Sequence, residues 1–464
     1  MRSRPWGRGN QLGTNEPRRY QGASESTAYA NPDGTHVAPL TSPGWDNRSV
    51  TVRASSVSRA PASAGISGDG PTGISVGVPV GGRPARPLAV RVRAALRRAA
   101  PALLLYAAVR VLGVVALALW GPADGKEARH LLSARWDSIW YARIAEQGYG
   151  YTLQLAGGKV HSDLAFFPLL PWLERSLSAI FPLSAGDAGL VVSAVASLAA
   201  AWGIFAVGAL RYGRRAGVAL AVLWAALPVG VVESMAYSES LFTALAAWGL
   251  YCVLTGRWAW AGALAALAGL TRPVGAAVVA AVWLTAAVVL VRARRRGEAP
   301  PFGRVLPGVV LAPLGWLAYV AWVGVRTGSV TGYLDVQGGW GNGFDGGLAF
   351  GSFIWERLTG PAWPAGVALL LGVALVIRLY LAGVRQGQPL PLLVYTGTVL
   401  LLALTAKGYF GSKPRLMLPA FPLLLPLAVA LARLRTVRAV PVMTAVALAS
   451  AAYGAFWLHG SGPP

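Results

Sequence analysis

The stretch AAPALLLYAAVRVLGVVALALW at residues 99–120 decides the class of fold. A helix that crosses a bilayer needs about 20 mostly apolar residues, and this stretch supplies them with Arg110 as its single charge. The arginines directly before it are Arg91, Arg93, Arg97 and Arg98. Because basic residues beside an apolar helix are retained in the cytoplasm, the sequence predicts a membrane helix that starts inside.

The composition extends this prediction to the whole chain. Of its 464 residues, 55% are hydrophobic and only 13% are charged, and the mean hydropathy is +0.51. Soluble proteins are about a quarter charged, so these values indicate an integral membrane protein. The net charge of +23 comes from arginines spread over the N-terminal region and between apolar segments, so we expect the bilayer, and no nucleic acid, as partner.

Ten further apolar segments follow residues 99–120, which predicts an all-α bundle of about eleven transmembrane helices. They lie near 186–210, 216–233, 239–255, 258–272, 274–292, 303–325, 362–384, 390–406, 416–432 and 437–458. Residues 1–97 are rich in Gly, Ser, Pro and Arg and predict a disordered, basic cytoplasmic tail. Residues 98–460 would then form one polytopic domain in the cell membrane.

The largest connection, near 121–185, is predicted to face outward and holds the most suggestive residue, Asp137. Trp136, Trp140 and Tyr141 surround it at helical spacing, which predicts an amphipathic helix at the membrane interface. The carboxylate either catalyses a reaction or pairs with an arginine, and spacing alone favours the ion pair. A second interfacial stretch at 166–172 contains Phe167 and either lines a groove for a lipid or sugar or anchors the chain.

Two charged residues are predicted close to membrane depth. Glu239 follows Ser238 at the start of an apolar segment, and an acid there is typical of helix capping, which we favour over catalysis. Arg272 precedes Pro273, and a buried arginine suits a phosphate ligand. A structural ion pair with Glu233 or Glu239 explains Arg272 equally well.

Two later outer connections hold further candidates for substrate binding. Gln337 and Trp340 lie among glycines near 326–361, and an amide with an indole suits a sugar. Lys413 and Arg415 lie in a turn without acids, against the positive-inside trend, which favours a phosphate ligand. The single cysteine and the scattered histidines show no metal-ligand spacing, so we expect no metal and no cofactor.

Four sequence blocks together resemble one family. They are RWDS through IAEQGY at 135–149, AFFPL at 165–169, YSESLF at 237–242 and TRPVG at 271–275. They look like the PIG-V type of mannosyltransferase, related to the second mannosyltransferase of glycosylphosphatidylinositol synthesis, in its bacterial, actinobacterial branch. The resemblance covers roughly residues 99–460. Residues 155–163 depart from the family pattern, and Asp163 is the candidate for a second acid there.

The resemblance implies a GT-C fold with an active site at the outer membrane face. It implies a donor in which mannose is carried on polyprenyl phosphate, and Asp137 as the general base that activates an acceptor hydroxyl, with inversion. Cations that would stabilise the leaving phosphate are Arg272, Lys413 and Arg415. The other expected substrate-binding residues are Arg135, Trp136, Asp163, Phe167, Tyr237, Glu239, Gln337 and Trp340. The acceptor is a glycolipid, a glycan or a protein.

Two other functions remain open from the sequence. A flippase or transporter for a lipid-linked glycan would use the same aromatic and cationic side chains to hold its substrate. It would place ionisable residues along both halves of a pathway, whereas here they gather on the predicted outer side. A membrane scaffold would leave the acid among aromatics and cations unexplained.

Overall fold

A computed structural model describes residues 88–462, without residues 125, 126 and 461. Most of the predicted tail, residues 1–87, therefore lies outside the described residues. Residues 88–97 are helical and extend the first membrane helix, because Leu, Ala, Val and Arg without Gly or Pro suit a helix.

The described residues form eighteen α-helices. The first nine are α1 (Leu88–Asp124), α2 (Ala128–Ser133), α3 (Asp137–Gln147), α4 (Leu169–Ile180), α5 (Ala185–Tyr212), α6 (Arg214–Ala225), α7 (Ser238–Leu254), α8 (Trp258–Gly269) and α9 (Ala276–Arg295). The others are α10 (Phe302–Leu311), α11 (Leu314–Thr327), α12 (Gly332–Gly339), α13 (Leu348–Thr359), α14 (Trp363–Arg385), α15 (Leu390–Thr405), α16 (Lys413–Met417), α17 (Leu425–Arg433) and α18 (Thr436–His459).

Strands in the described residues form two short antiparallel pairs. β1 (Thr152–Gln154) pairs with β2 (Val160–Ser162), with Leu153 opposite His161. β3 (Gly343–Phe344) pairs with β4 (Ala406–Lys407). Short 3-10 helices lie at Ala156–Gly158, Asp163–Ala165, Gly230–Ser234, Pro273–Gly275, Phe410–Ser412 and Phe421–Leu424.

Six of the described helices are long and apolar enough to cross a membrane. They are Val92–Gly121, Ala185–Tyr212, Pro273–Arg295, Phe302–Thr327, Trp363–Arg385 and Thr436–His459, and the bent pair Phe410–Met417 and Phe421–Arg433 would be a seventh. This confirms a helical, multi-spanning membrane protein. The count of eleven is not confirmed, because α7, α8 and α15 are shorter.

The predicted span at 216–233 is not one helix. Pro228 follows α6 closely, and the chain continues as the 3-10 helix Gly230–Ser234 before α7 begins. A proline removes a backbone donor and crowds the preceding turn, so it ends a helix here. At 1.5 Å per residue, the twelve residues of α6 reach about 18 Å, well short of a bilayer core.

Small residues let the central helices approach closely. α5 packs against α6 and α7, while α1 packs against α18. A Cβ placed on Gly208 of α5 would lie 2.9 Å from the Cα of Gly217 in α6, and one on Gly203 would lie 2.9 Å from Ala247 in α7. Such small-residue contacts are typical of membrane bundles.

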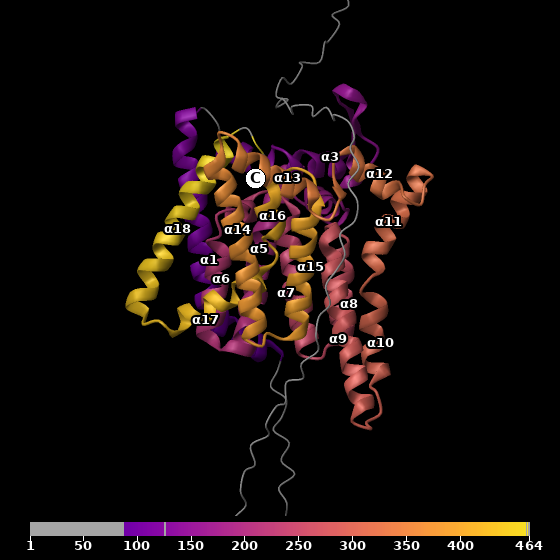
Figure 1. Cartoon of the computed structure of the whole chain (residues 1–464), viewed down its shortest axis with the longest axis vertical. Helices are drawn as coiled ribbons and strands as arrows, with labels where there is room; N and C mark the ends of the chain where they lie inside the picture. Colours follow the sequence, from indigo (N-terminus) through magenta and orange to yellow (C-terminus); the bar gives the residue numbers. More distant parts are fainter. Residues whose placement is uncertain (1–87, 125–126, 461, 463–464) are drawn as a thin grey trace, which may run out of the picture. The chain divides into compact units, whose positions relative to one another are not determined.

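One end of the bundle gathers the elements that matter for function. In Figure 1, α3, α12 and α13 lie at the same end as the C-terminal end of α18, and α17 lies at the opposite end. The connection at 121–185 contains helices at the two stretches predicted to be interfacial, as α3 and α4. The loop with Asp137 therefore shares its end of the bundle with the glycine-rich connection after α11.

Candidate functional site

Four charged side chains from distant parts of the sequence meet at this end. Asp137 Oδ2 lies 2.8 Å from Arg415 Nη1, and Arg415 Nε lies 3.3 Å from Glu239 Oε1. The same Glu239 oxygen lies 2.6 Å from Arg272 Nη1. The four residues, which we call the ion-pair cluster, thus form a chain of alternating charge.

Local structure positions each member of the cluster. Asp137 is the first residue of α3, and Glu239 lies in the first turn of α7. Both acids therefore lie where the helix dipole stabilises negative charge. Arg272 directly precedes the 3-10 helix that starts at Pro273, and Arg415 lies in the short helix α16.

The members of the cluster differ in how deeply they are buried. The side chain of Asp137 is 25% exposed, those of Arg272 and Arg415 are 11% and 10% exposed, and that of Glu239 is fully buried. Two acids and two bases balance in charge, as buried ionic groups require. Asp137 is the acid of the cluster that a ligand can reach most easily.

Hydroxyl groups extend the cluster. Arg272 Nη1 donates to Ser238 Oγ at 3.0 Å, and the Tyr141 hydroxyl lies 2.8 Å from the same oxygen. The Asp137 backbone amide donates to the Tyr237 hydroxyl at 3.4 Å, and the Arg415 guanidinium lies over the ring of Tyr237. Burial raises the pKa of Tyr141, against the lowering effect of Arg272, so its hydroxyl stays protonated.

The residues before Asp137 fix its position. Trp136 has a φ of +51°, and no other non-glycine residue in the described part of the chain has a positive φ. A bulky residue rarely adopts this conformation, so its surroundings must impose it. Arg135 stacks on the Trp136 ring at 3.9 Å and donates to the carbonyl oxygens of Leu458 and Gly460 at 2.7 and 3.0 Å. The end of α18 thereby holds the chain at Asp137.

An aromatic wall lies beside the cluster. The ring of Tyr141 meets Phe166 edge-on at 5.1 Å, and Trp140 stacks on Phe166 at 5.6 Å. Trp340 contacts Trp140 at 4.9 Å, donates from its indole nitrogen to the Ser162 carbonyl, and stacks on His161 at 4.0 Å. Burial and the nearby Lys159 lower the pKa of His161, which favours its neutral form.

Several predicted binding residues have structural partners instead. Both backbone amides of Gly150 and Tyr151 donate to Asp163 Oδ2, at 2.9 and 2.8 Å, so the buried Asp163 holds the loop after α3. Phe167 is buried against Tyr319, with ring centres 4.3 Å apart. The structure does not bring these two side chains into the ion-pair cluster.

Gln337 and Lys413 likewise form hydrogen bonds with nearby groups outside the ion-pair cluster. Gln337 donates to the Tyr333 hydroxyl at 3.0 Å and accepts from Asn342 at 2.9 Å. Lys413 Nζ donates to the carbonyl oxygens of Ala403 and Ala406 at 2.6 and 2.5 Å, which satisfies the end of α15. Of the two cations in the basic turn, Lys413 and Arg415, Arg415 is the one that belongs to the ion-pair cluster.

The sequence predicted interfacial or capping roles, and no substrate-binding role, for three residues that the structure places here, namely Tyr141, Ser238 and Trp140. Tyr141 lies one turn after Asp137, so its spacing was a usable signal. The other two depend on tertiary contacts. Among the described residues, no group of three or more His, Cys, Asp or Glu could hold a metal ion.

Comparisons with known proteins are limited to solved structures, because no family model and no curated protein matches the sequence. ArnT from Cupriavidus metallidurans in the apo state is 18% identical, with a TM-score of 0.47, and the match covers 72% of this chain and 59% of that one. For ArnT bound to undecaprenyl phosphate the values are 14%, 0.45, 73% and 61%. The apo oligosaccharyltransferase of Archaeoglobus fulgidus gives 12%, 0.45, 77% and 56%. The chain therefore spans less than two thirds of these proteins.

Proposed function

We propose that this protein is a GT-C-type membrane glycosyltransferase that transfers mannose from a polyprenyl-phosphate donor to an acceptor hydroxyl at the outer membrane face. The observation that carries this proposal is the ion-pair cluster. It presents a partly exposed carboxylate next to two arginines at one end of a membrane bundle. The family resemblance of the blocks around Asp137, Tyr237 and Arg272 supports the choice of sugar and donor.

The proposed reaction assigns a task to each charge. Asp137 accepts the proton of the acceptor hydroxyl as its oxygen bonds to the anomeric carbon. The bond between that carbon and the phosphate oxygen breaks, and its electron pair leaves with the polyprenyl phosphate. The attack from the opposite side inverts the anomeric configuration. Arg272 and Arg415 stabilise the phosphate charge, as planar guanidinium groups do well.

Glu239 holds both arginines in this arrangement. Its buried carboxylate contacts Arg272 and Arg415 through the same oxygen, so the two guanidinium groups are brought together despite their like charge. We assign Glu239 a positioning role, with Asp137 as the base. Trp136 and Arg135 position Asp137 from the other side.

The alternative function is a flippase for a lipid-linked glycan. It is favoured by a second interior pair, in which Arg110 Nε lies 3.6 Å from Glu233 Oε2, which also accepts from the Tyr106 hydroxyl at 2.8 Å. Arg110 also donates to the backbone carbonyls of Ala225 and Gly230. Those bonds satisfy the break between α6 and α7, so we assign the pair a structural role.

The test uses membranes supplied with labelled polyprenyl-phosphate-mannose. We expect Asp137→Asn to lower transfer of the label by 10²- to 10⁴-fold, the usual contribution of a general base. Glu146→Gln, an exposed acid on the same helix, is the matched control and should retain transfer. Normal transfer by a well-expressed Asp137→Asn variant would refute the assignment. Movement of intact donor across vesicles without transfer would favour the flippase.

A further inference from the structure

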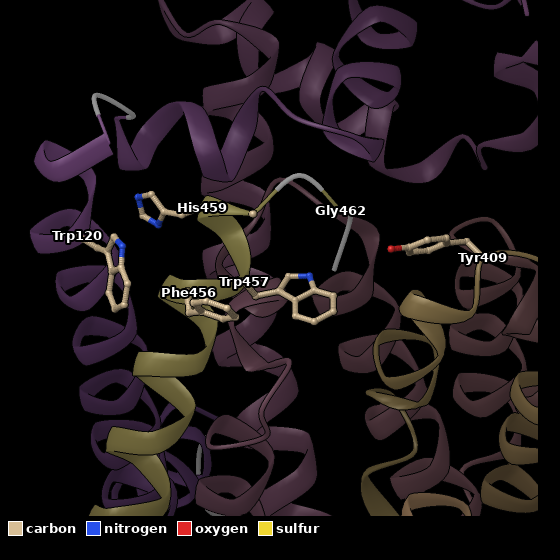
Figure 2. A pocket seen from close by; sticks show the side chains of 7 residues that line it. Trp120, Tyr409, Phe456, Trp457, His459 and Gly462 are labelled. Atoms are coloured by element: carbon tan, nitrogen blue, oxygen red, sulfur yellow. The ribbon is translucent and has the colours of Figure 1, made fainter. Parts of the chain in front are cut away.

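A recess lies at the same end of the bundle as the ion-pair cluster. It is a cavity of about 560 Å³ between the C-terminal ends of α1 and α18 and the segment that precedes α16. Figure 2 shows its aromatic lining. Its walls include Trp120, Tyr409, Phe456, Trp457, His459 and Gly460. A volume of this size is within the range of small-molecule sites.

Two of the walls are connected to the cluster. The carbonyl oxygen of Gly460 accepts a hydrogen bond from Arg135, which lies two residues before Asp137. Tyr409 lies in the turn that leads into α16, where Arg415 pairs with Asp137. The cavity is therefore bounded by the segment that leads to Arg415 and by the end of α18, which is hydrogen-bonded to Arg135 near the proposed base.

The lining has the chemistry of a site for a neutral sugar. Its aromatic faces suit the apolar C–H faces of a pyranose, and none of its lining residues is an acid, a lysine or an arginine. The indole nitrogen of Trp457 is buried and has no hydrogen-bond partner among the described residues. In Figure 2 this nitrogen and the Tyr409 hydroxyl lie on the sides of their rings that face across the cavity.

These features distinguish a sugar from other occupants. A phosphate would lack a cation in this lining. A lipid chain would leave the Trp457 N–H without an acceptor, and an unsatisfied buried donor is costly. A hexose supplies both the apolar face and the oxygen that this donor requires.

We propose that the cavity binds a neutral hexose residue of the acceptor and so presents the acceptor hydroxyl to Asp137. The inference rests on the proposed function for the direction of transfer, but binding of the sugar is independent of it. Trp457 donates to a sugar oxygen, and the Tyr409 hydroxyl bonds to another. The sugar stacks on the aromatic walls, as Trp and Tyr rings allow.

The first experiment measures binding alone. The full chain in lipid nanodiscs is titrated with methyl α-D-mannopyranoside and followed by saturation-transfer NMR. We expect saturation of the sugar protons, with affinity about tenfold weaker in Trp457→Phe, which keeps the ring and loses the donor. Trp363→Phe is the matched control, because Trp363 is 59% exposed on α14 and does not line the cavity. No saturation, or equal affinity in both variants, would overturn the inference.

The second experiment measures transfer from labelled polyprenyl-phosphate-mannose to octyl α-D-mannopyranoside. We expect Trp457→Phe to raise the KM for the octyl mannoside about tenfold while the KM for the donor and kcat change little. Transfer with an unchanged acceptor KM would refute this cavity and leave the enzyme assignment intact. Binding that depends on Trp457 in a chain without transfer would support the cavity and contradict the glycosyltransferase.

Discussion

Substitution of Glu239 by glutamine tests whether this carboxylate holds the two arginines together. The change keeps the shape of the side chain and removes its charge. Arg272 then loses a partner at 2.6 Å and Arg415 one at 3.3 Å. Arg415 keeps Asp137 at 2.8 Å, and Arg272 keeps the Ser238 hydroxyl at 3.0 Å. Each guanidinium group thus loses one partner and keeps another.

The expected loss in the free energy of unfolding follows from these remaining contacts. Removal of one partner from a buried pair costs about 3–5 kcal/mol. Because both arginines are about a tenth exposed and retain another partner, we expect the lower end, about 3 kcal/mol, for Glu239→Gln. Arg272→Gln should cost a similar amount, since it leaves Glu239 fully buried with only Arg415. The double variant removes both charges together and should cost about 4 kcal/mol rather than the sum of about 6 kcal/mol.

The assay is the free energy of unfolding of the purified protein in mixed micelles, titrated with SDS and followed by tryptophan fluorescence. Coupling of about 2 kcal/mol between Glu239 and Arg272 is the expected result. Additivity of the two single changes within about 0.5 kcal/mol would refute the pairing on which the positioning role depends. Arg129→Gln is the control, because its pair with Asp187 lies at the surface and should leave the unfolding midpoint unchanged.

Two further predictions concern a buried acid on α4 and a close contact between α8 and α11. Burial, and secondarily the charge of Glu146, raises the pKa of Glu174 well above its usual range, so the stability it contributes is full at low pH and is lost as pH rises through that raised pKa. Thermal unfolding between pH 5 and 9 should show Glu174→Gln gaining stability over the wild type as pH increases, and parallel curves would contradict this. Gly315→Ala should destabilise by about 1–3 kcal/mol, because its Cβ would collide with the Ala266 carbonyl oxygen, while Gly303→Ala, which has open space, should not. Equal unfolding midpoints for both alanine variants would refute the close contact.

Helix positions were largely predictable from the sequence, whereas span lengths were not. Each of the eleven apolar segments contains helix, because about 20 apolar residues can satisfy their backbone groups only in this way inside a bilayer. Hydropathy does not show where a helix ends within an apolar run. Pro228 ended α6, and the bend of 77° between the halves of the seventh candidate span lies around Pro419.

All four members of the ion-pair cluster were named from the sequence, but their pairings could be predicted only in part. Sequence left Arg272 open between Glu233 and Glu239, and the fold decides for Glu239 because Glu233 faces α1. Lys413 and Arg415 looked equivalent in the sequence. Side chains two positions apart on a helix point to different faces, so only Arg415 reaches Asp137.

The hydrogen bonds from Arg135 to Leu458 and Gly460 give the C-terminal region a practical use. They join the end of α18 to Arg135, which lies two residues before Asp137 in the sequence. An environment-sensitive fluorophore attached at Gly462, which lines the aromatic cavity at the same end of the bundle, would therefore report on occupancy of that cavity without a label inside the ion-pair cluster. The far end of the chain thus offers an optical sensor for substrate arrival at that cavity.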